Sequence, residues 1–359
     1  MALVSAYERI AGLPVRVDSY ELEGHDREYG DFTRPSTLIR LRGDGHEGLG
    51  EDVVYDVLDH VAHRDAGAVH DLSGPRTLGE LCDLLGELDL FGDAPPVRDP
   101  SRRYRRWAYE SAALDLALRQ SGVPFHEAIG RDPKPVRFVC STRLGSFGDD
   151  DRGSTTEPLR KRLAKHPELR FKLDPENDWA AELIAEIRDL AGVDVLDLKG
   201  LDRGTPVDVE TDPELYDAVA EAFPDAYLED PDVNTETRPV LEPRAERVTW
   251  DAPLHSVADI EHLEWEPRAI NSKPSRFGSL REVFAVYEHC GREGISIYGG
   301  GQGEQNVGRG HIQYLASVFH PDTPNDVAPS GYNDPSVPDG LPDSPLDPVP
   351  SATGFRWGE

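Results

Sequence analysis

The sequence predicts an α/β protein in which a (β/α)8-type barrel follows a smaller N-terminal α+β domain. From about residue 136, short apolar runs alternate with amphipathic helical segments, which is typical of a parallel sheet covered by helices. Before residue 125 the chain shows an alternating strand and one long helical segment instead. We therefore expect an N-terminal domain over residues 1–125, a barrel over 126–332, and a tail over 333–359.

The N-terminal part contains one clear strand and one clear helix. Ser36–Arg42 alternates like a strand and runs into a glycine turn. The preceding His25–Pro35 is polar and rich in Gly and Asp, which predicts a mobile loop. Tyr104–Gly122 has helical spacing and is stopped by Gly122-Val-Pro124.

Eight short apolar runs qualify as barrel strands. They lie at Arg137–Ser141, Leu169–Leu173, Val193–Leu198, Ala226–Glu229, Arg247–Asp251, Arg268–Ser272, Ile295–Tyr298 and Asp326–Ala328. The clearest helices between them run from Asp178 to Ala191 and from Asp212 to Phe223. Asp178 and Asp212 are the expected N-caps, and Pro213 suits the first helical position.

The end of the chain differs in composition from the barrel. Residues 333–359 carry repeated Pro and Asp, which alone would indicate a loosely ordered tail. Phe355-Arg-Trp357 at its end is apolar and aromatic, so we expect the tail to dock back on the N-terminal domain.

Charge limits the choice of partners. The 359 residues include 68 acidic and 38 basic ones, a net charge of −30, and only six are lysines. Such an acidic field repels nucleic acid and anionic membranes, so we expect neither as a partner. Because the acids are spread along the chain, we interpret them as a solvated surface suited to high salt rather than as an acidic tail.

Other sequence patterns argue against a membrane or secreted location and against zinc and nucleotide cofactors. Apolar runs are too short for a membrane helix, and Met1–Arg9 does not resemble a signal peptide, so we expect a cytoplasmic protein. Cys82, Cys140 and Cys290 are widely spaced, which predicts inert thiols rather than a disulfide framework or zinc site. The glycine-rich Gly299–Gly303 lacks the residues of a nucleotide-binding loop.

Charged residues at the predicted strand ends suggest the chemistry. Because the active sites of barrels lie at the carboxyl ends of the strands, we examined these positions in order. Asp197, Glu229 and Asp251 end three adjacent strands and together suit a hard divalent cation such as Mg²⁺, with Mn²⁺ as an alternative. Lys172 and Lys273 end strands on either side, where each could act as acid or base on one face of a substrate.

Three further polar residues share faces with this set. Period-two alternation places Arg170 with Lys172, Lys199 with Asp197, and Asn271 with Lys273, as candidates for contact with a substrate. Lys199 could bind a second substrate carboxylate or pair with a nearby acid such as Glu229. The residues alone leave both options open.

Several motifs resemble the enolase superfamily, in particular its branch of muconate lactonizing enzyme and o-succinylbenzoate synthase. The resemblance extends over nearly the whole chain. The motifs that carry it are Leu38-Ile-Arg-Leu-Arg-Gly-Asp-Gly45 with Gly48-Leu-Gly-Glu51, Ser111-Ala-Ala-Leu-Asp-Leu-Ala-Leu118, Arg170-Phe-Lys172, and Gly299-Gly-Gly301 through Gly308-Arg-Gly310. The resemblance implies an enolase-type barrel with an N-terminal capping domain. It also implies that Lys172 and Lys273 are the acid/base pair, and that Mg²⁺ lies on Asp197, Glu229 and Asp251.

The resemblance implies roles for residues outside the strand ends as well. The segment from His25 to Pro35 would fold over the barrel mouth, with Arg27, Tyr29 and Phe32 against the substrate. Gln302 and Glu304, just after the glycines, are further candidate substrate contacts. By analogy we also expect a homo-oligomer.

The chain departs from the family pattern at three positions. Lys199 stands where Asn is usual, Ala252 follows the third expected metal ligand where Glu is frequent, and Arg170 replaces the first member of the usual second-strand pair. His311 lies on the helix after the seventh strand, too deep for a histidine base, so we interpret it as structural.

The expected activity is Mg²⁺-dependent removal of the proton next to a substrate carboxylate, giving an enediolate. That species can lead to racemisation or epimerisation, cycloisomerisation or dehydration, and the sequence does not choose among these isomerase and lyase outcomes. Two alternatives are a sugar-acid dehydratase and a metal-binding barrel that has lost catalysis.

Overall fold

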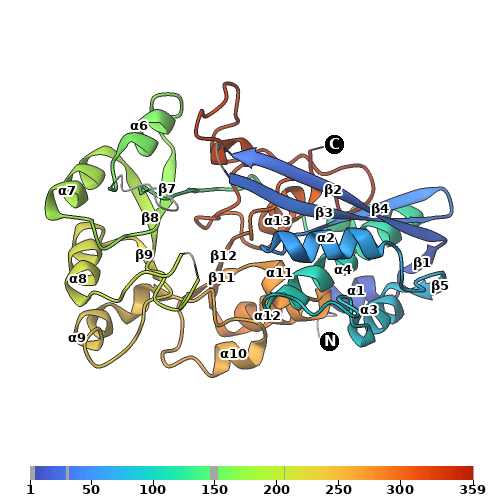
Figure 1. Ribbon diagram of the computed structural model, residues 1–359. Coiled ribbons are helices and arrows are strands. Elements are labelled where there is room, and N and C mark those ends of the chain that lie inside the picture. Colours follow the sequence, from blue (N-terminus) through green and yellow to red (C-terminus); the bar gives the residue numbers. More distant parts are fainter. Residues whose placement is uncertain (1–4, 30–31, 146–152, 206, 359) are drawn as a thin grey trace.

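The structure is a computed structural model that describes residues 5–29, 32–145, 153–205 and 207–358 (Figure 1). The side chains of Tyr29 and Phe32 are outside this description. Two parallel-stranded segments form the barrel, and an antiparallel sheet with long strands lies to one side of it (Figure 1). No helix in the described ranges is long and apolar enough to cross a membrane.

The N-terminal domain combines two small antiparallel sheets with helices. Its elements are α1 (Ala6–Ala11), β1 (Pro14–Val17), β2 (Ser19–Tyr29), β3 (Phe32–Gly43), β4 (His46–Asp52), α2 (Val57–Ala66), β5 (Gly74–Thr77), α3 (Leu78–Glu87), α4 (Ser101–Ser121) and α5 (Phe125–Ile129). The order is β2-β3-β4 in the larger sheet, and β1 pairs with β5 in the smaller one. As predicted, α4 ends at Gly122, which has the left-handed conformation that glycine adopts without strain.

The segment predicted as a mobile loop is instead the far end of a hairpin. β2 and β3 stay in register along their whole length, and His25 lies opposite Ser36. The prediction was wrong because the backbone ladder, rather than an apolar alternation, holds these strands together. Polar composition therefore concealed β2 and the first residues of β3, whereas the rest of β3 was predicted as the strand Ser36–Arg42.

The N-terminal domain depends on a close approach between β4 and α4. A Cβ atom on Gly48 would lie 2.2 Å from the backbone oxygen of Ala112, and one on Gly50 would lie 1.9 Å from that of Ala108. Both positions therefore require glycine, since any side chain would push the strand off the helix. This contact fixes the strand whose last residues face the barrel.

Seven short parallel strands line the barrel. They are β6 (Cys140–Thr142), β7 (Arg170–Leu173), β8 (Gly192–Asp197), β9 (Tyr227–Glu229), β10 (Val248–Thr249), β11 (Ala269–Ser272) and β12 (Ser296–Gly299). Neighbours in sequence pair from β6 to β10, and β11 pairs with β12. The Asn271 N–H donates to the Trp250 carbonyl at 2.9 Å and so joins the two groups.

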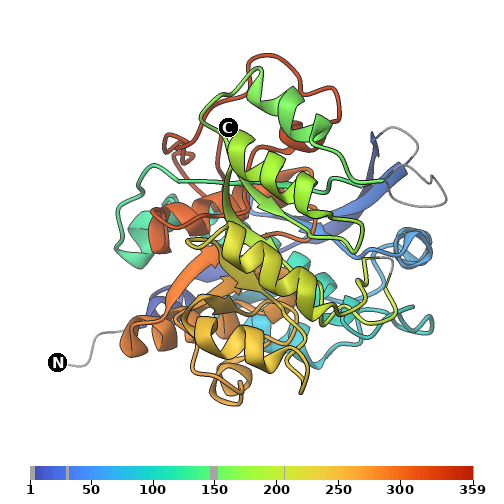
Figure 2. The ribbon, with the colours of Figure 1, turned by 90° about the vertical axis from the view of Figure 1, so that its left-hand side faces the viewer.

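Helices cover the outside of these strands. They are α6 (Glu157–Leu163), α7 (Ala181–Leu190), α8 (Pro213–Ala222), α9 (Arg238–Leu241), α10 (Val257–Glu261), α11 (Pro274–Phe277), α12 (Leu280–Glu293) and α13 (Val307–Phe319), with the 3-10 turns η1 (Glu242–Arg247) and η2 (Ser330–Asn333). Figure 2 shows the green and yellow helices of this layer following one another across the face turned to the viewer. The expected barrel with an N-terminal domain is confirmed.

Two local predictions in the barrel were wrong. The expected strand at Asp326–Ala328 is only a crossing point, where Asn325 bridges Phe138 and the Asp326 N–H donates to the Gly299 carbonyl at 2.7 Å. These few bonds nevertheless close the ring between β12 and β6. Asp178 does not cap α7, because its carboxylate accepts from Ser154 instead.

The other cap was predicted correctly. The Asp212 side chain accepts from the Glu214 N–H at 2.9 Å, and Pro213 occupies the first turn of α8. Asp212 thus satisfies one of the backbone donors that a helix start leaves free.

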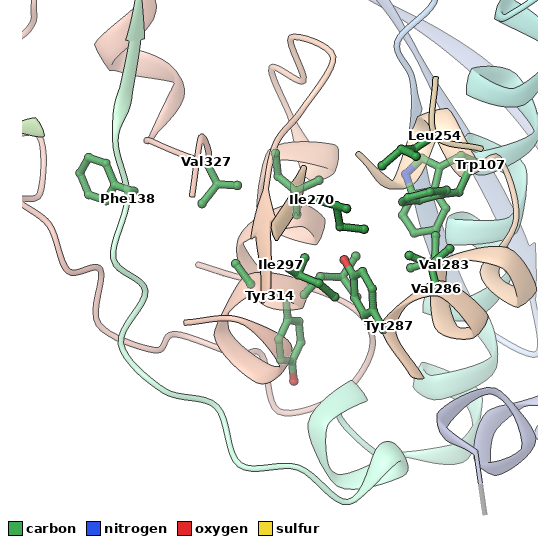
Figure 3. Close-up of a cluster of buried hydrophobic side chains, with 14 of the residues drawn as sticks. Trp107, Phe138, Leu254, Ile270, Val283, Val286, Tyr287, Ile297, Tyr314 and Val327 are labelled. Carbon is green, nitrogen blue, oxygen red and sulfur yellow. The ribbon is translucent and has the colours of Figure 1, made fainter. Parts of the chain in front are cut away.

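The barrel strands turn apolar side chains outward onto the helices. Figure 3 shows Ile270 of β11 and Ile297 of β12 facing Val286 and Tyr287 of α12. Ile270 and Val286 are fully buried. Because side chains alternate along a strand, this packing leaves Asn271, the next residue of β11, to point into the barrel.

The end of the chain packs against α4, α5 and α13. Phe355 stacks on His311 with ring centroids 4.3 Å apart, and its ring lies 4.7 Å from that of Phe125. The Arg356 Nε donates to the buried Asp115 carboxylate at 2.8 Å. The three-part division of the chain at residues 125 and 332 stays a prediction.

Candidate functional site

A cavity of about 230 Å³ opens at the carboxyl ends of the barrel strands. Its lining is polar and rich in cations. The lining residues are Ser141, Lys172, Asp197, Lys199, Lys273, Gly301, Gly303, Arg309, Asp326 and Asn333. Both expected acid/base lysines and one expected metal ligand therefore line one space.

Lys172 extends from β7 into a pair of carboxylates. Its side chain is 2% exposed, and its Nζ lies 2.5 Å from Glu229 Oε1 and 2.9 Å from Asp197 Oδ2. β7 is almost fully buried after its first residue, so the lysine ammonium has no path to bulk water along the strand. An ammonium in this position is stable only because two acids compensate its lost hydration.

Lys273 approaches from the opposite part of the ring, at the end of β11. Pro274 follows it and disfavours a helical conformation at Lys273, which keeps an extended backbone before α11 begins. Its Nζ lies 2.7 Å from Asp251 Oδ2. Arg276, one turn into α11, binds the same carboxylate, with its Nε 3.1 Å from Oδ1.

Lys199 pairs with a nearby acid, which was one of the two options that the sequence left open. The Lys199 Nζ lies 2.5 Å from Asp197 Oδ2, the oxygen that also receives Lys172, and 4.0 Å from Asp174 Oδ1. A nearby acid therefore holds Lys199, although that acid is Asp197 rather than Glu229.

Glu229 is fixed by groups other than lysine as well. Tyr298 donates its hydroxyl to Oε2 at 2.6 Å, and the Asn271 Nδ2 donates to Oε1 at 3.1 Å. Thr249 and Tyr298 in turn share a hydrogen bond of 2.7 Å. This network orients both carboxylate oxygens of a residue that is completely buried.

The protonation states follow from burial and charge together. Burial alone would lower the pKa of Lys172, but Asp197 and Glu229 outweigh it and raise that pKa well above its usual value. Burial is likewise outweighed at Lys273, whose pKa Asp251 raises. The pKa of Asp197 is lowered despite its burial, because Lys172 and Lys199 both stabilise its charge. With these pairs in place, the lysines carry their protons.

Three carboxylates lie close enough to share a metal ion. Asp197, Glu229 and Asp230 each offer an oxygen, and these oxygens lie within 4.8 Å of one another. Sequence reasoning missed Asp230, which follows Glu229 directly and would point outward in a regular strand. Its positive φ of 47° turns the backbone at this point, and no alternation pattern signals such a turn. The doublet of acids before Pro231 is the one signal available in the sequence.

Asp251 fits a metal better than Asp230 does. Both Asp230 oxygens accept backbone N–H groups, from Asp251 and Ala252, each at 2.8 Å. Within the described part of the chain, Asp197 Oδ1 and Asp251 Oδ1 are buried and accept no hydrogen bond, although Asp251 Oδ1 forms an ion pair with the Arg276 Nε at 3.1 Å. Buried carboxylate oxygens that accept no hydrogen bond are what a cation ligand set requires.

Arg170 is not part of this group. Its side chain is 45% exposed and binds Asp194, with Nη2 2.6 Å from Oδ1. Arg170 is the first residue of β7, at the amino end of the strand and away from the cavity at the carboxyl ends. The β7–β8 register shift lies on β8, where Asp194 is the extra residue. The structure therefore corrects the expected contact between Arg170 and a substrate, because Arg170 does not line the cavity.

Gln302 and Glu304 lie beside the cavity but are used internally. The Gln302 Oε1 accepts from the Tyr55 hydroxyl at 2.5 Å, and the Glu304 carboxylate accepts from the Gln302 N–H. Both side chains are buried. They hold the glycine-rich turn in place, which leaves their predicted contact with a substrate without structural support.

Of the three hairpin residues that were expected to contact a substrate, the structure describes the side chain of Arg27 alone. Arg27 donates to Ser330 Oγ at 3.2 Å, beside the η2 turn, and the side chains of Tyr29 and Phe32 lie outside the described residues. Arg309, which the sequence analysis did not select, lines the cavity from the first turn of α13 and donates to the Glu304 carbonyl. His311 is completely buried under Phe355 and does not line the cavity.

Comparison with known proteins identifies relatives along the whole chain. Two family models match, described as the N-terminal and C-terminal domains of a domain of unknown function (DUF8230), over residues 8–128 and 132–334. An o-succinylbenzoate synthase from Geobacillus stearothermophilus is 23% identical over 334 residues, which cover 85% of this chain and 80% of that protein.

Solved structures share the fold. A member of the enolase superfamily from Listeria innocua matches with a TM-score of 0.61 and 18% identity, covering 88% of this chain and 86% of that one. A dipeptide epimerase from Methylococcus capsulatus, complexed with a Mg ion, matches with a TM-score of 0.63 and 18% identity, over 86% and 89% of the two chains. The expected resemblance to the enolase superfamily is therefore confirmed in the fold.

Proposed function

The chain belongs to the family described as a domain of unknown function (DUF8230), and we propose that it is a Mg²⁺-dependent enzyme that removes the proton next to a substrate carboxylate. One observation carries the proposal: Lys172 and Lys273 are buried on different strands, line one cavity, and each contacts a carboxylate of the expected metal site. Its relatives include a synthase and an epimerase.

The metal would be held by Asp197, Glu229 and Asp251. Asp197 Oδ1 and Asp251 Oδ1, which accept no hydrogen bond within the described residues, belong to this set, and Asp230 binds backbone N–H groups instead. Bound there, Mg²⁺ supplies the positive charge that stabilises negative charge developing on both oxygens of the substrate carboxylate. The epimerase among the matched structures is complexed with Mg, which supports this choice of ion.

Lys172 and Lys273 would move the proton. With Mg²⁺ held by Asp197 and Glu229, the ion would offset the negative charge that now keeps Lys172 protonated, and the burial of Lys172 would then favour the neutral amine that a base requires. Lys273 keeps a second cation, Arg276, beside the carboxylate it shares. Because like charges disfavour protonation, Lys172 and Arg276 both oppose the rise that Asp251 causes in the pKa of Lys273.

The two lysines lie on strands separated by β8, β9 and β10, so they can address two faces of one substrate. Racemisation or epimerisation would use both as alternating base and acid. Cycloisomerisation or dehydration would use one for the proton and the other as a cation. We propose a small-molecule carboxylate as the substrate and a homo-oligomer as the working form.

Exchange of the substrate proton tests the proposal. The protein is incubated with Mg²⁺ in D₂O, at low and at multimolar KCl, with pools of N-acyl amino acids, dipeptides, muconates, the succinylbenzoate precursor and sugar acids. Mass spectrometry follows deuterium uptake and new products. We expect exchange that requires Mg²⁺ and falls by at least about 10³-fold in Lys172→Met and in Lys273→Met.

A matched control separates this effect from loss of charge in general. Lys161 is 54% exposed and pairs with Glu157 one turn away, so Lys161→Met should exchange like the wild type. Exchange that survives in both active-site variants would refute the lysine mechanism. Bound metal without exchange in any pool would favour a barrel that has lost catalysis.

A further inference from the structure

Lys199 occupies an unusual place at the end of β8. It is two residues after Asp197, and its ammonium binds the same carboxylate oxygen, Oδ2, that Lys172 binds. One oxygen thus carries two ammonium groups, at 2.5 and 2.9 Å. Lys172 has Glu229 as a second close partner at 2.5 Å, whereas the next acid, Asp174, lies 4.0 Å from the Lys199 Nζ.

The backbone holds Lys199 in this position. Its φ is +54°, a left-handed conformation that a lysine adopts only when its surroundings enforce it. The residues on either side supply that constraint: the Leu198 N–H donates to the Glu229 carbonyl, and the Gly200 N–H donates to the Asp230 carbonyl. A Cβ atom on Gly200 would lie 2.1 Å from the Asp232 nitrogen, so this turn fits closely against the next strand end.

We propose that Lys199 is a tethered cation that competes with metal ions for Asp197, so that the site admits divalent cations and rejects monovalent ones. The inference rests on the metal site of the proposed function. Its basis is a charge comparison. A monovalent ion that displaces the Lys199 ammonium from Asp197 leaves the net charge beside that carboxylate unchanged. It must also compete with the ammonium itself, whose effective concentration is high because its side chain is fixed two residues away. A divalent ion adds one positive charge to a cluster of buried carboxylates.

The composition of the chain gives this selectivity a purpose. A net charge of −30 draws monovalent cations to the whole molecule, and a cluster of buried carboxylates would concentrate them further. Lys199 fills the position that such an ion would take, without closing the site to Mg²⁺. The cost is a weaker affinity for the divalent ion, because that ion must displace the ammonium.

Metal binding without turnover tests the inference. Mn²⁺ is titrated into the wild type and Lys199→Met, and free Mn²⁺ is followed by electron paramagnetic resonance. Each titration is run in tetramethylammonium chloride and in KCl at equal ionic strength, because the first cation is too large for the site. We expect Lys199→Met to bind Mn²⁺ at least about tenfold more tightly in tetramethylammonium chloride. KCl should weaken binding to the variant several-fold more than binding to the wild type.

Three further variants make the comparison specific. Lys199→Arg keeps the charge and should bind Mn²⁺ no more tightly than the wild type. Lys199→Gln should behave like Lys199→Met and replaces it if the Met variant does not fold. Lys161→Met removes a remote charge and should leave Mn²⁺ affinity within about twofold.

The outcomes separate this inference from the proposed function. Equal or weaker Mn²⁺ binding in Lys199→Met and Lys199→Gln overturns the inference and leaves the metal site standing. An equal effect of KCl on wild type and variants overturns the claim of selectivity. Absence of Mn²⁺ binding in every protein overturns the metal site, and with it both the inference and the proposed function.

Discussion

Acid should destabilise this protein partly through His311, one of several histidines whose pKa values are lowered by burial. His311 of α13 is 0% exposed, stacks on Phe355, and has neither ring nitrogen hydrogen-bonded within the described residues. Burial, with a contribution from Arg356, lowers its pKa from 6.5 to about 3. The folded protein therefore keeps His311 neutral at a pH where the unfolded chain has already bound a proton.

The size of the effect follows from the two pKa values. Because the folded pKa is the lower one, the stabilising contribution is complete above pH 6.5 and is lost as the pH falls towards 3. Between pH 8 and pH 5 the free energy of unfolding should fall by about 2 kcal/mol through His311 alone. His311→Phe keeps an aromatic ring against Phe355 and removes the titrating group.

Urea unfolding at pH 8 and pH 5 measures this contribution. The loss of unfolding free energy between the two pH values should be smaller by about 2 kcal/mol in His311→Phe than in the wild type, since other groups titrate equally in both. His46 is exposed on β4, and His46→Phe should lose as much as the wild type does. A pH dependence in His311→Phe that matches the wild type within about 0.5 kcal/mol would refute the argument.

Three further substitutions test packing and the site. Arg356→Met leaves the buried Asp115 carboxylate without its cation and should lower the unfolding free energy by about 3–5 kcal/mol in urea titrations. Gly50→Ala would place a Cβ 1.9 Å from a backbone oxygen of α4, so a loss of about 3 kcal/mol or more is expected in the same assay. Gly300→Ala would place a Cβ 2.6 Å from a side-chain oxygen of β11 and should reduce deuterium exchange at least about tenfold, whereas Gly291→Ala, with nothing within 4 Å, should not.

The barrel could be predicted from sequence because its strands are short, apolar and separated by helices. The expected strand at Leu169–Leu173 differs from β7 by one residue, and the expected helix after Asp212 matches α8 closely. Buried parallel strands carry their signal in composition, which survives without knowledge of the fold. The hairpin at His25–Pro35 was missed because its stability comes from backbone pairing, to which polar residues contribute as well as apolar ones.

The candidate site was predictable where it followed strand alternation and not where the backbone departs from it. Lys172, Asp197 and Lys273 are ordinary strand-end residues, and the structure brings them to one cavity. Asp230 depends on a positive φ, which leaves no trace in residue spacing, and Arg170 stands at the amino end of β7, away from the cavity. A positive φ of this kind occurs where a strand gives way to a turn, so alternation stops predicting side-chain direction at the site itself.

The choice between lysine and arginine supports the chemical role of the site. Only six of the 38 basic residues are lysines, and arginine holds the buried carboxylates elsewhere, as Arg105 does with Asp52. Where charge alone is needed, this chain uses arginine, which stays protonated and binds carboxylates in a fixed fork. Half of its lysines nevertheless line one cavity of about 230 Å³. The proton transfer proposed for Lys172 and Lys273 would explain that choice, because an amine can release its proton and a guanidinium cannot. At Lys199 the useful property is a compact charge that a divalent ion can displace, which is why metal affinity rather than turnover is the informative measurement there.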